Sequence, residues 1–209
     1  MMTRLPTLKG EAMRWSRILV SFGALLIAGC SSPELPNHPP LTFTQYQPIY
    51  MAVSSVEFVQ DYKSPMKPPY VENLMPYSPA EAMQIWVRDR LKTGGGTKTM
   101  KVIVKDGSVK AVQLPTGSGI KGFLTIEQDR RYDARLAVEM RIYGNSPIAE
   151  ADIEANANRS VTMSEDASVA ERDDVFRKLI ADMMADMNAE LEKDLYQYMS
   201  NYISYSQTP

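Results

Sequence analysis

The stretch Arg135–Asn158, RLAVEMRIYGNSPIAEADIEANAN, holds two runs in which apolar and polar residues alternate, separated by Gly144-Asn-Ser-Pro147. A period of two is typical of antiparallel strands with one covered and one wet face. Small alanines dominate the apolar side of the second run, so we expect a large element, most simply a helix, to press closely on it. The inward positions are Leu136, Val138, Met140, Ile142, Ala149, Ala151, Ile153, Ala155 and Ala157.

A candidate for the covering helix follows directly. Ser168-Val-Ala-Glu171 has the pattern of a capping box, and apolar residues from Phe176 to Tyr202 then recur at helical spacing. A typical strand is only about 20 Å long, so we expect the first half to cover the sheet and the 196–205 end to overhang or bend. Its exposed members are candidate partner contacts: Tyr196, Tyr198 and Tyr202.

Further strands are expected upstream. The run 49–59 is rich in β-branched and aromatic residues and has a bend near Ser54-Ser55. The run 100–112 reads as a hairpin with Asp106-Gly107 as its tight turn. We expect another strand at 123–128 and a turn at 129–133.

A second helix should begin at Ser78-Pro79-Ala80-Glu81, where serine caps, proline occupies the first turn and glutamate completes the box. We expect Gly94-Gly95-Gly96 to end it. The fold class predicted is α+β: an antiparallel sheet of about five strands, covered by a short helix and a long C-terminal helix.

The segment 63–77 reads as a long loop with four prolines. Such loops are commonly functional or mobile. It is either a docking surface or a loop packed on its own domain, and the pattern leaves both open. Its candidate partner contacts are Met66, Tyr70, Met75 and Tyr77.

The N-terminal region has the features of a secretory signal peptide, with Arg14 and Arg17 ahead of the apolar run 18–27. This run is shorter than the roughly 20 residues that a spanning helix needs. The true start is either Met1 or Met13. Leu26-Ile27-Ala28-Gly29-Cys30 resembles the lipobox of bacterial lipoproteins. The resemblance implies cleavage between Gly29 and Cys30 and attachment of palmitate-type acyl chains at Cys30.

The predicted organisation is a signal peptide at 1–29, a lipidated, proline-rich linker at 30–47, and one periplasmic domain at 48–205. Ser31 and Ser32 resemble the outer-membrane sorting signal of lipoproteins, which implies an anchor in the outer membrane with the domain on its periplasmic side. Two or three acyl chains would make that anchoring effectively permanent.

Charge argues against a nucleic-acid partner. The chain has 23 basic and 25 acidic residues, and beyond residue 29 it has 19 and 24; no basic footprint for phosphate is present. Charge is uneven, with 12 basic and 6 acidic residues in 86–147 but 5 and 13 from 148 onward. This indicates either a basic binding surface or a basic sheet complementing an acidic helix.

We expect no catalytic residue, metal site or cofactor. The chain has one histidine, His38, in the proline-rich linker, and one cysteine, Cys30, which leaves no Ser-His-Asp, Cys-His or thiolate-zinc set. Acidic residues fall at outward positions of the predicted strands and helix. The sequence therefore predicts a protein that is not an enzyme.

In length, lipobox and element order the chain is similar to auxiliary lipoproteins of ABC-type lipid transport systems linked to mammalian-cell-entry proteins. Lipopolysaccharide-assembly lipoproteins share the layout, but Ser-Ser-Pro follows Cys30 here. The resemblance implies an accessory subunit with an envelope protein partner and a possible lipid ligand. The alternatives are a scaffold or regulator of a cell-wall enzyme and a periplasmic hydrolase.

Overall fold

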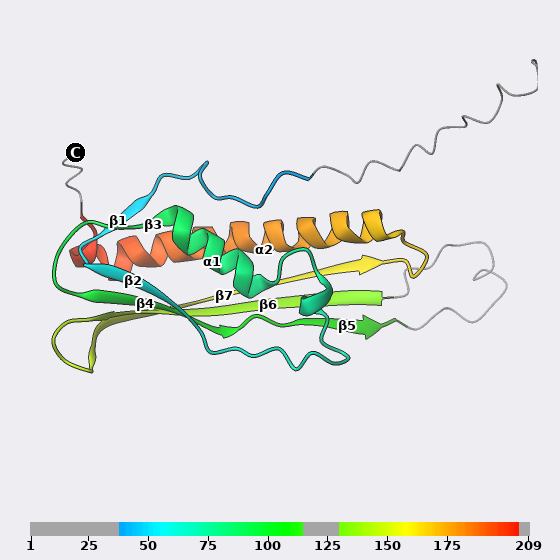
Figure 1. Ribbon diagram of the computed structural model, residues 1–209, viewed down its shortest axis with the longest axis horizontal. Coiled ribbons are helices and arrows are strands. Elements are labelled where there is room, and N and C mark those ends of the chain that lie inside the picture. The colour runs from blue at the N-terminus through cyan, green and yellow to red at the C-terminus, as the bar shows by residue number, and fades with distance from the viewer. Residues whose placement is uncertain (1–37, 115–129, 205–209) are drawn as a thin grey trace, which may run out of the picture. The chain divides into compact units, whose positions relative to one another are not determined.

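A computed structural model describes residues 38–114 and 130–204. At its centre β6 (Arg130–Tyr143) and β7 (Ala149–Met163) pair antiparallel, with Leu136 opposite Ala157 and Ile142 opposite Ala151. The two alternating runs therefore form the predicted antiparallel pair. Figure 1 shows α1 and α2 lying along one face of this sheet.

The other edge of β6 carries two strands end to end. β4 (Thr99–Asp106) pairs with its second half and β5 (Val109–Gln113) with its first half, both antiparallel. The predicted hairpin at Asp106-Gly107 is therefore wrong. The Ser108 amide donates to Asp106 Oδ1 at 2.9 Å, and the Ser108 carbonyl accepts from the Arg135 amide at 2.8 Å. Asp-Gly therefore joins two strands that follow one another along the same side of β6.

Two neighbouring predictions also change. Residues 130–133, expected in a turn, are the start of β6, and the predicted strand at 123–128 lies outside the described residues. The predicted first strand divides at the expected bend into β1 (Ile49–Met51) and β2 (Ser55–Gln60).

The main sheet is mixed, because β2 lies parallel to β4, with Ser55 opposite Thr99 and Gln60 opposite Val104. The wholly antiparallel sheet predicted from alternation is wrong at this edge, since the chain returns from β2 through a helix and parallel neighbours need such a crossover. β1 pairs in parallel with β3 (Leu91–Thr93) in a second, two-stranded sheet. The architecture is the predicted α+β class, with five strands in the main sheet.

The helix α1 (Pro79–Arg90) has the predicted capping box: Ser78 Oγ accepts from the Glu81 amide, and Glu81 Oε2 accepts from the Ser78 amide. It ends at Arg90, ahead of the predicted glycine stop. Gly95 and Gly96 have φ of 90° and 116° and instead form the turn between β3 and β4, where that conformation suits glycine.

The helix α2 (Val169–Tyr198) begins with the second predicted box at Ser168 and Glu171. Its 30 residues span about 45 Å, and the 15 residues of β7 span about 50 Å. Of the two expected outcomes, the overhang does not occur, because the strands are much longer than average, whereas the bend does: the helix ends at Tyr198 and the chain turns there. Leu191, Leu195 and Met199 are all fully buried.

The end of the described chain is part of the fold. The 3-10 helix η2 (Ser200–Tyr202) follows α2, and the Ser204 amide then donates to the Tyr50 carbonyl at 2.7 Å. Ile203 forms a bridge with Met51 and is 8% exposed. The last turn of the chain thus holds β1 in place.

A buried polar cluster joins the two helices. Trp86 Nε1 donates to Asn188 Oδ1 at 2.9 Å, and Arg90 Nε donates to the same oxygen at 3.1 Å. Arg90, at 1% exposure, also meets Glu192 at 2.5 Å through its second terminal nitrogen. One amide oxygen therefore satisfies donors from two buried side chains of α1.

Removing that oxygen should be costly. Asn188→Ala leaves two buried donors without an acceptor, and we expect a loss of about 2–4 kcal/mol in the free energy of unfolding, measured by urea denaturation. Asn156→Ala, on the exposed side of β7, is the matched control and should change stability by less than about 0.5 kcal/mol. Equal stability of the two variants would contradict the role assigned to Asn188.

The C-terminal turn gives a second prediction. Ile203→Ala should lower the free energy of unfolding by about 2–4 kcal/mol, because it opens a cavity beside β1. Ile148→Ala, at a side chain that is 76% exposed, serves as control. Thermal unfolding of the two variants would separate them, and an unchanged midpoint for Ile203→Ala would show that the turn does not secure β1.

Candidate functional site

Residues 38–48, the N-terminal strap, lie against α1 and α2 (Figure 1). The sequence predicts a linker at 30–47 and a domain that begins at 48. In the structure, residues 38–47 pack on the domain. Phe43 is 4% exposed, and Leu41 and Tyr46 pack partly against the core. The apolar residues at 41, 43 and 46 are a signal that this stretch packs on the domain, whereas the prolines beside them indicate a linker.

The strap follows α2 from its first turns to its last third. His38 Nε2 lies 3.1 Å from Asp174 Oδ1, and the Gln47 carbonyl accepts a hydrogen bond from Arg90, which also pairs with Glu192. Between these contacts the strap makes one turn, in which the Tyr46 amide donates to the Phe43 carbonyl at 3.1 Å, while the 18 helical steps from Asp174 to Glu192 cover about 27 Å. The strap therefore runs alongside α2 over this distance.

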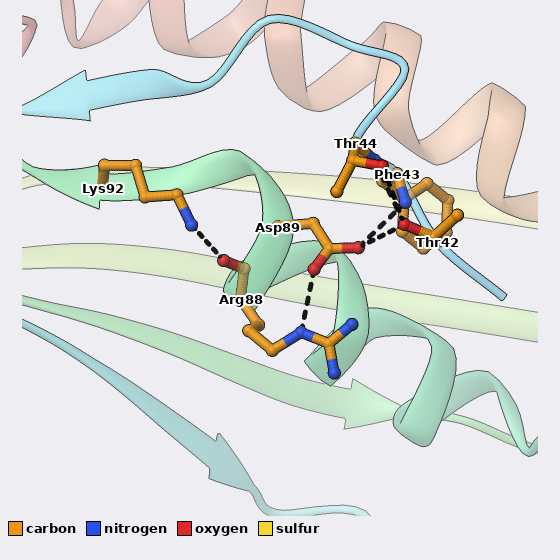
Figure 2. A network of polar contacts seen from close by, with 6 residues as sticks. All are labelled: Thr42, Phe43, Thr44, Arg88, Asp89 and Lys92. Atoms are coloured by element: carbon orange, nitrogen blue, oxygen red, sulfur yellow. Dashed lines mark hydrogen bonds and ion pairs between the residues drawn. The ribbon is translucent and has the colours of Figure 1, made fainter. Parts of the chain in front are cut away.

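Asp89 of α1 fastens the middle of the strap (Figure 2). Its Oδ2 accepts from the Phe43 amide at 2.9 Å and from Thr42 Oγ1 at 3.1 Å, while its Oδ1 accepts from Arg88 Nε at 2.8 Å. Burial of this carboxylate would by itself raise its pKa, but these donors outweigh burial and hold the Asp89 pKa below its usual range.

Between the strap and α2 lies a groove of about 510 Å³. Pro39, Pro40 and Leu41 line one wall, and Ile180, Ala181 and Ala185 of α2 line the other. Most of the lining is aliphatic, proline or aromatic. A groove of this size and character is within the range that holds small apolar ligands.

One end of the groove is cationic. Arg177 lies with its guanidinium carbon 5.3 Å from the centre of the Tyr77 ring, and Tyr77 Oη accepts from the Leu41 amide at 3.3 Å. Arg177 Nε is buried and has no hydrogen-bond partner in the described part of the chain. A buried donor without an acceptor is unusual in a native structure and calls for an explanation.

The predicted contact residues of segment 63–77 separate into different places. Tyr77 lines the groove, Met66 is 72% exposed, and Met75 packs partly against the core. Tyr70 bridges to Lys110 of β5, whose ammonium lies 5.2 Å from the tyrosine ring centre. Residues 70–72 and 75–77 of the segment thus pack at least partly on the domain, whereas 65–69 are all exposed.

The loop is held by one buried carboxylate, in the short helix η1 (Glu72–Leu74). Glu72 accepts from Tyr62 Oη at 2.6 Å and from the Val109 amide at 3.1 Å. Burial of Glu72 would raise its pKa, yet hydrogen bonds from Ser64, Tyr62 and the backbone amides of Glu72 and Val109 keep the pKa below its usual range. Burial and Glu72 together raise the pKa of Tyr62.

The predicted C-terminal contacts do not join the groove. Tyr196 and Tyr198 are 47% and 62% exposed, and Tyr202 lies near Glu150, with its Oη 3.4 Å from a carboxylate oxygen. Tyr196 is 19 helical steps from Arg177, about 28 Å. The seven predicted contact residues therefore do not form one surface, and only Tyr77 belongs to the groove.

The uncovered face of the sheet mixes both charges. Lys101 and Lys105 meet Glu57 and Asp61 at 3.3 and 2.7 Å, and Arg141 pairs with Glu139. On the other side of the sheet, Arg159 Nε reaches Asp186 of α2 at 2.6 Å. Three further ion pairs join the basic stretch 86–147 to the acidic one from 148 onward: Arg90–Glu192, Lys98–Glu150 and Arg130–Glu165.

Within 38–114 and 130–204, no set of three or more histidine, cysteine, aspartate or glutamate side chains is placed to hold a metal ion. No helix of the same residues is both long and apolar enough to cross a membrane. Cys30 and Gly29, the predicted lipidation and cleavage residues, lie outside the described residues.

Comparison with protein-family models gives no match, and comparison with curated proteins gives none. A minor lipoprotein from Acinetobacter baumannii matches at 13% identity over 77% of this chain and 100% of its own, with a TM-score of 0.37. The rare lipoprotein B from Shewanella oneidensis matches at 9% identity over 69% of this chain and 98% of its own, with a TM-score of 0.31. At such low identities and TM-scores neither likeness carries an argument about this chain.

The Asp89 contacts predict a pH-dependent strap. Because the folded-state pKa of Asp89 lies below its unfolded value of about 3.9, the stabilisation is present above about pH 4 and is lost as pH falls through the lowered value. Asp89→Asn should lower the free energy of unfolding by about 1–2 kcal/mol at pH 7, and the difference from wild type should shrink at pH 3.

Urea denaturation at both pH values would measure this difference, and hydrogen exchange of the Phe43 amide would locate it on the strap. Asp152→Asn, at an exposed position of β7, is the control and should leave both readouts near wild type. A gap between Asp89→Asn and wild type that stays constant down to pH 3 would contradict the assignment.

Proposed function

We propose that this protein is a lipid-anchored bacterial lipoprotein on the periplasmic side of the outer membrane, where it serves as a non-enzymatic accessory or binding subunit in envelope lipid transport. The observation that carries the proposal is the sequence Leu26–Cys30, placed directly after a basic and apolar leader. Ser31 and Ser32, with no aspartate beside the cysteine, favour the outer membrane.

The geometry adds a spatial argument. The packed strap begins at His38, eight residues after Cys30, and eight extended residues reach at most about 30 Å. A domain tethered at Cys30 would therefore stay close to the bilayer surface. This favours work on or beside the membrane over the alternative of a scaffold that reaches a distant cell-wall enzyme.

The groove under the strap supports a binding role. It is apolar along most of its length, cationic at one end, and formed partly by the segment that leads to the anchor. These features suit an amphiphilic ligand near a membrane. An accessory protein of lipid transport is the function that combines this groove with the tether.

Cross-linking in cells would identify the partner. The tagged, lipidated protein is then purified in mild detergent, and the proteins bound to it are identified by mass spectrometry. We expect a permease or mammalian-cell-entry subunit of a lipid transport system to be recovered. Recovery of a cell-wall synthase in its place would favour the scaffold and overturn the transport role.

The anchor gives a direct prediction. Cys30→Ala should abolish labelling of the protein by radioactive palmitate and release it from the membrane fraction, because no acyl chain can be attached. Ser31→Ala should keep both properties and serves as the matched control. A Cys30→Ala protein that still carried label and remained in the membrane would show that the anchor lies elsewhere.

A further inference from the structure

We propose that the groove beneath the N-terminal strap binds one acyl chain of an anionic membrane phospholipid, with the lipid phosphate at Arg177. This proposal rests on the proposed function, since it names the ligand class of an envelope lipoprotein. Its evidence is the lining of the groove, the state of Arg177, and the lack of a free backbone amide hydrogen at Pro39, Pro40 and Leu41, the strap residues that line the groove wall.

The shape of the groove fits one chain. About 510 Å³ lies between the strap and α2, which is within the range of about 300–1,000 Å³ seen for small-ligand sites. Ala181 and Ala185 keep the α2 wall low, and Leu41 and Ile180 provide apolar contact. An acyl chain buried there would be stabilised by each CH₂ group removed from water.

Arg177 supplies the charge that selects an anion. Among the described residues it has no carboxylate partner, whereas the nearby Lys178 is paired with Asp182 at 2.8 Å and Asp174 faces His38 at 3.1 Å. Its buried Nε lacks an acceptor. A phosphate oxygen would complete this hydrogen bond, and guanidinium groups suit phosphate geometry.

The strap offers a peptide little to bind. Pro39 and Pro40 have no amide hydrogen, the Leu41 amide donates to Tyr77, and the Phe43 amide donates to Asp89. The opposite wall is a helix, whose interior amides are already bonded within it. An extended peptide needs backbone partners, but an acyl chain needs none, so the groove favours lipid over protein.

The source of the chain follows from the phosphate. A thioether-linked diacylglycerol on Cys30 would carry acyl chains but no phosphate, so it would offer Arg177 only neutral ester oxygens and no negative charge. The groove is also within about 30 Å of the anchor along the chain. A phospholipid of the same bilayer can therefore reach it, with its headgroup at the Arg177 end.

The experiment is photo-cross-linking in cells with the full, lipidated chain. Benzoylphenylalanine is placed at Ala181 in the groove or, as matched control, at Ala189, an exposed alanine two turns later on α2. Cells are grown with radioactive orthophosphate and irradiated, and the protein is purified under denaturing conditions. The phosphorus label is counted, and the adduct mass identifies the lipid.

We expect phosphorus label at position 181 and at least tenfold less at position 189. Within the 181 protein, Arg177→Gln should lower the label about tenfold, since it removes a charge-assisted hydrogen bond. Lys193→Gln, at an exposed and paired lysine of α2 that does not line the groove, should keep the label. Ala185→Trp should lower it by filling the groove, and thermal unfolding would verify that each variant is folded.

Three results would overturn the proposal: equal label at both positions, an adduct without phosphorus such as the protein's own anchor, or cross-linking to a protein. Absence of any adduct at position 181 in a folded protein would do the same. Palmitate labelling of the unirradiated sample reports the anchor separately. Retained palmitate with no groove adduct refutes this inference alone, and loss of palmitate refutes the proposed lipoprotein.

Discussion

The arrangement of the helices and the strap depends on one buried charge. The guanidinium of Arg90 is removed from water, and such a group is tolerated only when it is paired and hydrogen-bonded. Its partners come from two separate parts of the chain: Asn188 and Glu192 on α2, and the Gln47 carbonyl and the Tyr46 ring, 5.3 Å away, on the strap. Glu192 balances the charge and the neutral acceptors complete its hydrogen bonds, so helix pairing and strap position depend on the same side chain.

The second constraint is one of length. The strands β6 and β7 are at least as long as α2, so a single amphipathic helix packs on the apolar side of both along its whole course. The small side chains of β7 allow close approach, and methionines such as Met183 and Met187 fill the space between. The groove exists because the outer side of this helix also receives the strap, which follows it at some distance over Ala181 and Ala185.

Local signals in the sequence predict the helices and strands well, but they predict less well which strands lie side by side. Alternation and capping boxes depend on nearby residues, so the β6–β7 pair and both helix starts could be predicted. The order of strands depends on contacts distant in sequence: nothing near Asp106-Gly107 shows that β5 continues along β6 beyond β4. The site was harder still. Of the predicted contacts only Tyr77 lines the groove. Arg177 was not predicted, because it can be distinguished from the other charged residues of α2 only once the helix and the strap are side by side.

The direction of the strap determines how tension along the chain would reach the domain. The contact nearest the predicted anchor is the half-buried His38 with Asp174, followed along the chain by the Leu41–Tyr77 bond, the Asp89 carboxylate and last the buried Arg90. If the chain is pulled away from the helix, we expect these contacts to open in that order. The strap would then lengthen the tether before the sheet and α2 bear the load.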